Sequence, residues 1–222
     1  MNNKMLFIDL DDTLFEEIKY VESGFVEVSK YVADLNGISN NEIFNQLMYQ
    51  FNKYGRTGVF NRVMSHFELG YPSISDMIIK YREHMPNIQT YDGVYDSIMG
   101  LKSVFDNTFL VTDGIVGVQR NKVLALGLEK YVDGVIYCME YNSPKPSIAS
   151  IEQYTKNIPF DRSKSKMIGD DPFCDMECAY RLGIGAIRVL TGRFKNIKCN
   201  KDNSVPEFYS FCDVAKFLVG DK

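Results

Sequence analysis

The chain has 222 residues, of which 45% are hydrophobic and 24% are charged. This length suits one full domain with a smaller inserted unit, and the composition is that of a globular protein whose core needs no disulfide bonds. The formal net charge of −4 gives no electrostatic reason to expect a nucleic-acid or membrane-surface partner.

The cysteines and the apolar stretches bear on where in the cell the protein is located. There are five cysteines, an odd number, and we find no secretory signal and no apolar stretch of membrane-spanning length. Reduced thiols and a cytoplasmic location are therefore expected, with no membrane partner. The sequence does not indicate an oligomeric state.

The first predicted element is a buried strand over residues 5–9, followed directly by carboxylates. Four apolar residues, beginning at Met5, lead into Asp9, Asp11 and Asp12. Asp is a poor strand residue, so the acids should lie at the carboxyl end of the strand, where ligands bind in open α/β sheets. Three neighbouring acids repel one another, and a hard divalent cation would relieve that repulsion. An acidic loop without a ligand is the alternative interpretation of this stretch alone.

Residues 16–88 are predicted to form an all-helical insertion. Apolar residues recur at three- and four-residue steps to about residue 36, and further helices are predicted from residue 40 to about 51, over 59–69 and over 73–85. No strand pattern interrupts them, so we expect a small helical domain with its own core. Inserted after the first strand, it would overhang the carboxylates as a lid that excludes water and selects the substrate.

From residue 89 onward, strands alternate with helices. Strands are predicted over 108–112, 135–138, 166–169 and 186–190, and helices over 94–104, 116–127, 146–157, 173–182 and 212–219. The tail from Gly192 to Glu207 is predicted to be irregular. This alternation favours a doubly wound, mostly parallel α/β sheet. The predicted domains are a core of residues 1–15 and 89–222 and a helical cap of residues 16–88.

Polar residues stand at the carboxyl ends of four predicted strands, which meet at one edge of a parallel sheet. In chain order they are Asp9 and Asp11, Thr112 and Asp113, Lys145, and Asp170 with Asp171 and Asp175. Together they suit phosphate-ester chemistry: a carboxylate nucleophile, a second carboxyl that carries protons, a hydroxyl and an ammonium for the phosphoryl oxygens, and acids for Mg²⁺. Singly, each has an ordinary explanation as a turn residue, a solvated lysine or a helix cap.

These motifs resemble those of the haloacid dehalogenase (HAD) superfamily of phosphohydrolases. The stretch from Asp9 to Leu14 is similar to the first motif of that family, and Leu110 to Gly114 is similar to the second. Lys145, in a Lys-Pro pair, matches the third motif, and Gly169-Asp170 begins the fourth. The helical insertion resembles the C1 cap domain of that family, because it is all-helical and stands between the first two motifs.

The resemblance implies a role for each catalytic residue. Asp9 would be the nucleophile and Asp11 the acid and base, while Thr112 and Lys145 would hold the phosphoryl group. Asp113 is expected to contact the substrate, although many family members have Asn at this position.

The resemblance also implies a Mg²⁺ site. Asp9, Asp170 and Asp11, the last through its backbone carbonyl, would bind the metal, and Asp171 and Asp175 compete for a supporting role. The stretch Gln119 to Asp133, which includes Lys122, is similar to family members as well.

The predicted function is therefore Mg²⁺-dependent hydrolysis of a small phosphorylated metabolite through an aspartyl-phosphate. A phosphomutase acting on a sugar phosphate and a non-catalytic sensor or scaffold are the alternatives. A dehalogenase is disfavoured, since a halide leaves without a proton and would give Asp11 no task. Arg56 and Arg62 in the insertion are candidates for contacting a second anionic group of the substrate, or are simply exposed arginines. Sugar phosphates, nucleotides and glycolate-type phosphates all remain open as substrates.

Overall fold

The computed structural model describes residues 3–198 and 205–220. The chain divides into two compact units, one formed by Met1–Glu17 with Gln89–Lys222 and the other by Ile18–Ile88. We call them the core unit and the helical unit. The core unit contains the sheet, whereas residues 18–88 contain helices and no strand.

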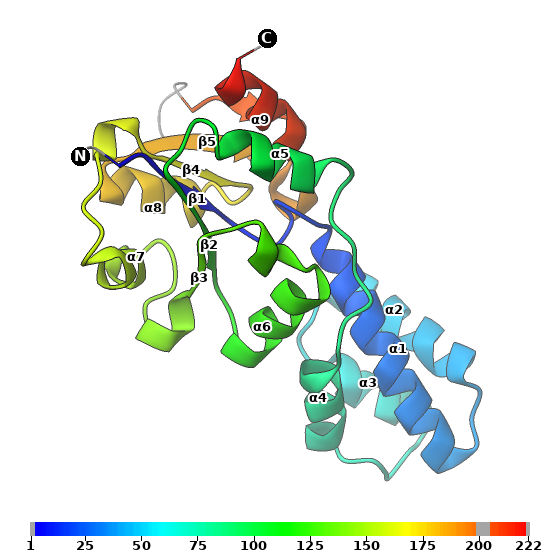
Figure 1. Cartoon of the computed structure of the whole chain (residues 1–222). Helices are drawn as coiled ribbons and strands as arrows, with labels where there is room; N and C mark the ends of the chain where they lie inside the picture. Colours follow the sequence, from blue (N-terminus) through cyan, green and yellow to red (C-terminus); the bar gives the residue numbers. More distant parts are fainter. Residues whose placement is uncertain (1–2, 199–204, 221–222) are drawn as a thin grey trace. The chain divides into compact units, whose positions relative to one another are not determined.

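The core unit is built on a parallel sheet with the strand order β3-β2-β1-β4-β5-β6 (Figure 1). The strands are β1 (Met5–Ile8), β2 (Asn107–Thr112), β3 (Gly134–Tyr137), β4 (Lys166–Gly169), β5 (Gly185–Val189) and β6 (Glu207–Phe208). In the register, Phe7 of β1 lies between Phe109 of β2 and Met167 of β4. The chain order reverses between β1 and β4, and the carboxyl ends at such a switch point form the usual ligand crevice. This doubly wound parallel sheet confirms the predicted fold class.

Helices cover both faces of the sheet, which explains why β1 is apolar at every position. The helices of this unit are α5 (Val94–Leu101), α6 (Val116–Ala125), α7 (Ala149–Thr155), α8 (Asp175–Leu182) and α9 (Phe211–Val219). Ile151 of α7 and Leu182 of α8 share a core cluster with Phe7. Helices α5 and α9 pack against each other, on the side of the sheet away from α7 and α8 (Figure 1).

The prediction of an irregular tail from Gly192 to Glu207 was wrong at both ends. Residues 192–194 form the short 3₁₀ helix η4, and Glu207 begins β6 (Glu207–Phe208). Residues 199–204 of this stretch lie outside the described residues. Strand β6 pairs with β5 in the register Arg188 to Glu207, and the Arg188 guanidinium lies 2.9 Å from the Glu207 carboxylate. A strand of two residues that is held by partners distant in the sequence leaves no periodic signal.

The helical unit has a core of its own. Its helices are α1 (Glu17–Asn36), α2 (Asn40–Tyr54), α3 (Val59–His66) and α4 (Ile74–Glu83). Buried residues from all four, among them Val28, Leu47, Val63 and Met77, form one cluster. A Cβ at Gly24 of α1 would lie 2.5 Å from the Tyr81 ring, so glycine allows this close packing. None of the helices in the described part of the chain combines the length and the apolar character needed to cross a membrane.

Three hydrogen bonds fix the segment where the chain leaves the core unit. The backbone N–H of Tyr91 donates to the carbonyl of Leu14 at 2.9 Å, so the points of departure and return lie side by side. Asp12 has a φ of 56° and accepts from the backbone N–H of Glu17 at 2.8 Å. The Thr191 hydroxyl donates to the carbonyl of Asp12. Asp12 therefore caps this turn and shapes the backbone here.

Candidate active site at the carboxyl edge of the sheet

Asp9 follows the central strand and is fixed by contacts on both carboxylate oxygens. Its backbone N–H donates to the carbonyl of Ile168 at 2.9 Å, which continues the pairing of β1 with β4. The Thr13 hydroxyl donates to Oδ2 at 3.0 Å, and the Lys145 ammonium donates to Oδ1 at 2.5 Å. Its side chain is 9% exposed, so the carboxylate is held in one place yet reachable from a cavity.

Lys145 is the buried cation of the site. Besides Asp9, its Nζ contacts the Asp175 carboxylate at 2.7 Å and the Val111 carbonyl at 3.2 Å. Burial opposes its charge, but Asp175 and Asp9 together raise the pKa of Lys145 well above its usual value. Its backbone N–H lies 3.1 Å from each carboxylate oxygen of Asp113. Asp113 therefore positions the Lys145 loop in this structure, and a direct contact of Asp113 with substrate stays a prediction.

Three buried carboxylates form a cluster here, and two of them contact this lysine. Oxygens of Asp9, Asp170 and Asp175 lie within 4.8 Å of one another. Burial raises the pKa of Asp9 to about 8, with Lys145 opposing the rise and Asp175 adding to it. Burial, followed by the charges of Asp9 and Asp175, raises the pKa of Asp170 to about 9. One lysine therefore does not compensate three acids, and the cluster favours further positive charge.

The donor set of this cluster fits a magnesium ion. Three carboxylates offer only hard oxygen ligands, which suit Mg²⁺, Ca²⁺ or Mn²⁺ rather than metals that prefer sulfur or imidazole. The metal ligands expected from the sequence were Asp9, Asp170 and the backbone carbonyl of Asp11. The structure brings Asp9 and Asp170 together and adds Asp175, which was a candidate for a supporting role. The Asp11 side chain lies outside this group of three.

The choice between Asp171 and Asp175 follows from the turn after β4. The Asp171 carboxylate accepts from the backbone N–H groups of Phe173 and Cys174, at 2.8 and 3.1 Å, so it caps the turn. Asp175 is buried and contacts Lys145. A Cβ at Gly169 would lie 2.2 Å from an Asp175 oxygen, which shows why glycine precedes Asp170. In this structure Asp175, and not Asp171, contacts Lys145 and belongs to the carboxylate cluster, while its support of a bound metal stays a prediction.

A cavity of about 240 Å³ opens over these residues. It is lined by Asp9, Asp11, Asp12, Glu17, Asp113, Gly114, Lys145, Asp170, Asp171, Cys174, Asp175, Arg193 and Phe194. Eight of these side chains are acidic and two are basic, so a bound cation would lower the repulsion between this cavity and a phosphate ester. Burial and then Asp171 raise the pKa of Cys174 to about 12, so its thiol stays protonated and is no nucleophile.

Asp11 has two partners on α6 that the sequence reasoning missed as site residues. The Lys122 ammonium lies 2.6 Å from Oδ1 of Asp11, and the Gln119 amide donates to Oδ2 at 2.8 Å. The same amide nitrogen contacts the hydroxyl of Thr112, which is buried at the end of β2. The only sequence signal for Lys122 was its place in a stretch that resembles the family. Arg193, which lines the cavity, was also missed, because it follows the chain's fifth strand, outside the four motifs.

The two arginines proposed for substrate recognition belong to the helical unit. Arg56 is exposed in the loop before α3. Arg62 of α3 donates from Nε to Gln50 at 2.9 Å and stacks over the Tyr54 ring at 4.8 Å. These contacts hold the Arg62 guanidinium in place, and a substrate role for either arginine stays a prediction.

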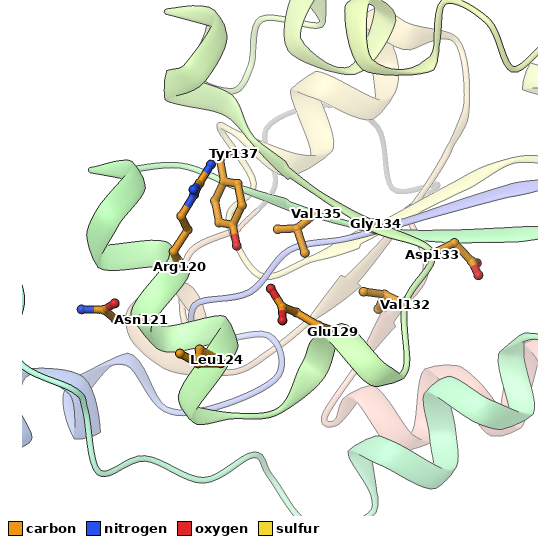
Figure 2. A pocket seen from close by; sticks show the side chains of 9 residues that line it. All are labelled: Arg120, Asn121, Leu124, Glu129, Val132, Asp133, Gly134, Val135 and Tyr137. Atoms are coloured by element: carbon orange, nitrogen blue, oxygen red, sulfur yellow. The ribbon is translucent and has the colours of Figure 1, made fainter.

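A second hollow, of about 490 Å³, lies beside the edge strand β3 (Figure 2). It is lined by Arg120, Asn121, Leu124, Glu129, Val132, Asp133, Gly134, Val135 and Tyr137. None of the four groups of strand-end residues contributes to this lining, so we assign the chemistry to the smaller cavity. Figure 2 shows Arg120 beside the Tyr137 ring, and the guanidinium lies 5.3 Å from the ring centre.

Comparison with known proteins gives the same picture. The chain is 25% identical to a glyceraldehyde 3-phosphate phosphatase of Methanocaldococcus jannaschii, over 98% of this chain and 99% of the relative. It is 24% identical to the pyrimidine 5'-nucleotidase PynA of Streptococcus pneumoniae, over 83% and 82% of the two chains. Among solved structures, its fold is similar to the HAD-hydrolase YfnB of Bacillus subtilis bound to magnesium, with a TM-score of 0.66, 18% identity and coverage of 98% and 99%.

The match to a family model is broader than any single motif. It spans residues 5–189, from β1 to the end of β5, and thus includes every strand-end residue of the site. The prediction made from the four motifs is confirmed: the chain belongs to the haloacid dehalogenase-like hydrolase family.

Proposed function

We propose that this protein is a Mg²⁺-dependent phosphatase that hydrolyses a small phosphorylated metabolite through an aspartyl-phosphate. The observation that carries the proposal is the Asp9 carboxylate, fixed 2.5 Å from the buried Lys145 ammonium and grouped with Asp170 and Asp175 at the cavity. A positioned carboxylate with adjacent positive charge is what nucleophilic attack on a phosphate ester requires.

In the first step, an oxygen of Asp9 forms a bond to phosphorus while the bond to the leaving oxygen breaks. Asp11 gives its proton to that oxygen, and the alcohol leaves. In the second step, water attacks the phosphorus and gives a proton to Asp11, and the bond to Asp9 breaks. Inorganic phosphate leaves, and both carboxyl groups return to their starting states. Lys145 and the Thr112 hydroxyl hold the phosphoryl oxygens during both steps.

The metal site in this proposal consists of Asp9 and Asp170, with the backbone carbonyl of Asp11 as the third protein ligand and Asp175 in support. A bound Mg²⁺ supplies positive charge that offsets the repulsion between the acids and an anionic substrate. Asp175 contacts the Lys145 ammonium at 2.7 Å and keeps it in place. Asp175 thus supports both Lys145 and the metal site.

For the substrate, the curated relatives point first to triose phosphates. Relatives from Methanocaldococcus jannaschii and Methanopyrus kandleri are named glyceraldehyde 3-phosphate phosphatases, and the pneumococcal relative is a pyrimidine nucleotidase. We therefore propose glyceraldehyde 3-phosphate first and pyrimidine nucleoside monophosphates second. The proposal includes a cytoplasmic location, which the thiols support: the four cysteines among the described residues are all free. The fifth, Cys199, lies outside them.

The proposal is tested by phosphate release from a panel of phosphorylated metabolites with Mg²⁺ and with EDTA. Wild-type protein should release phosphate only with Mg²⁺, and Asp9→Asn should abolish turnover while its circular dichroism spectrum is unchanged. Retained activity in Asp9→Asn would remove the nucleophile assignment. An isomerised sugar phosphate in place of free phosphate would identify a phosphomutase, and no turnover of any ester would favour a non-catalytic role.

A further inference from the structure

Helix α6 buries polar side chains where an ordinary helix of such a sheet buries apolar ones. Its buried residues are Gln119, Lys122 and Val123, which share one face at the spacing i, i+3 and i+4. Gln119 is 2% exposed and Lys122 is 3% exposed. Burying an amide and an ammonium costs free energy unless each finds partners, so this face calls for an explanation beyond packing.

Both polar side chains are directed at Asp11. Lys122 contacts Oδ1 of Asp11 at 2.6 Å, and Gln119 contacts Oδ2 at 2.8 Å. With each oxygen held by a different donor, the carboxyl group cannot rotate about its own axis without losing one contact. The Lys122 ammonium also lies 5.9 Å from the centre of the buried Phe15 ring, which limits its movement on the other side.

Gln119 also connects Asp11 to the second strand end. A side-chain amide has two N–H donors, and here Nε2 contacts both Asp11 and the Thr112 hydroxyl. One amide therefore fixes the spacing between the carboxyl that carries the proton and the hydroxyl that holds the phosphoryl group. That spacing has to match the geometry of the transferring phosphoryl group and its leaving oxygen.

We propose that Lys122 and Gln119 are positioning residues that aim Asp11 at the leaving oxygen of the substrate. This inference rests on the proposed phosphatase function and adds to it two residues outside the four motifs. Neither side chain touches the reacting phosphorus in this account. They act by holding Asp11. Their loss should therefore lower activity most on substrates whose leaving oxygen depends most on a donated proton.

An exposed residue of α6 provides a matched control. Arg120 precedes Asn121 and Lys122 in the chain, but its side chain is 60% exposed, pairs with Glu140 and lines the hollow beside β3 (Figure 2). Arg120→Met removes a paired cation from the same helix without touching Asp11. Any effect of a lost charge or a loosened helix on the site would appear in this variant too.

The experiment compares two esters of similar shape, phenyl phosphate and p-nitrophenyl phosphate, with Mg²⁺ present. The nitrophenolate leaves as a stable anion, whereas the more basic phenolate needs a proton. Lys122→Met and Gln119→Leu should lower kcat/KM for phenyl phosphate about 10- to 100-fold more than for p-nitrophenyl phosphate. Asp11→Asn should give the largest ratio, and Arg120→Met should leave the ratio at the wild-type value. With the best metabolite substrate, Lys122→Met should lower kcat and leave KM nearly unchanged.

The possible outcomes separate the inference from the function beneath it. If wild-type protein releases phosphate but both variants lose activity equally on the two esters, or lose none, the positioning role is wrong and the phosphatase stands. A loss confined to KM for the metabolite also overturns it. If wild-type protein releases phosphate from no ester, the proposed function falls and the inference falls with it. Gln119→Leu, which keeps the Lys122 ion pair, decides the matter if Lys122→Met does not fold.

Discussion

Replacing Asp170 with Asn should stabilise the metal-free protein and at the same time remove its response to Mg²⁺. Asp170 lies in a cluster of three buried acids with one lysine as the shared cation. Burial, with Asp9 and Asp175 nearby, raises the pKa of Asp170 from 3.8 to about 9. The folded, metal-free protein therefore keeps this carboxyl protonated at neutral pH, although the unfolded chain ionises it.

The magnitude follows from that difference. The folded protein keeps this carboxyl protonated while the unfolded chain ionises it. Each pH unit above the ordinary pKa of Asp therefore lowers the free energy of unfolding by about 1.4 kcal/mol. At pH 7, about three units above 3.8, the penalty reaches about 4 kcal/mol. An amide of the same shape has no such penalty, so we expect Asp170→Asn to raise the free energy of unfolding by about 2 to 4 kcal/mol in EDTA. For a chain of this size, that corresponds to a rise of roughly 4 to 15 °C in Tm.

Calorimetry in EDTA between pH 6 and 8 measures the effect and its sign. A raised pKa means that the folded protein binds more protons than the unfolded chain between about pH 4 and 9, so wild-type stability should fall as the pH rises through this window. The slope should be shallower in Asp170→Asn. Mg²⁺ at one hundred times its Kd should stabilise wild-type protein by about 2.7 kcal/mol. Because Mg²⁺ binds the ionised carboxylates, a fixed Mg²⁺ concentration should stabilise wild-type protein more at pH 8 than at pH 6.

Asp171→Asn is the control for this prediction. The Asp171 carboxylate accepts from two backbone N–H groups, and an amide oxygen can accept from both as well. The Asp171 charge is the smallest of the named causes that raise the pKa of Asp170, so this variant should differ from wild-type protein much less than Asp170→Asn does, in EDTA and in Mg²⁺. The reasoning is refuted if Asp170→Asn is less stable than wild-type protein in EDTA, or if Mg²⁺ stabilises it as much as it stabilises the wild type.

Two further substitutions test other parts of the structure. Lys145→Met removes the cation shared by the buried Asp9 and Asp175 and should lower the free energy of unfolding in EDTA by about 3 to 5 kcal/mol, measured by urea titration; an unchanged midpoint would mean that the acids need no cation. Gly24→Ala places a Cβ 2.5 Å from the Tyr81 ring and should cost about 1 to 3 kcal/mol through overpacking, measured as a lower Tm; an unchanged Tm would show that the ring moves aside freely.

Much of the fold was readable because its signals are local. The run Met5 to Ile8 is apolar at every position since β1 is covered on both faces, and the polar residues that follow each strand mark one edge of the sheet. The edge brings Asp9, Lys145 and Asp170 into one cavity. The α-helices and β1–β5 were predicted in the right order, although several helices are shorter than their apolar patterns. The helix expected from 146, for example, begins at Ala149, after two prolines.

The rest of the site depends on contacts between distant parts of the chain. Lys122 looks like a solvated lysine in the sequence, and only the packing of α6 brings it to Asp11. Arg188 looks like a polar interruption in an apolar strand, yet its buried guanidinium donates to the carbonyl groups of Asp170 and Phe194, at 3.1 and 2.6 Å. These two backbone acceptors, together with the Glu207 carboxylate, satisfy that arginine, and no periodicity in the sequence indicates them.

The hydrogen bond between the Tyr91 N–H and the Leu14 carbonyl has a consequence for how such a chain can diversify. The core itself joins the two points that bracket the insertion, and the entropy of closing a loop changes only slowly with its length. Segments of very different size can therefore be exchanged at this position without disturbing the catalytic edge.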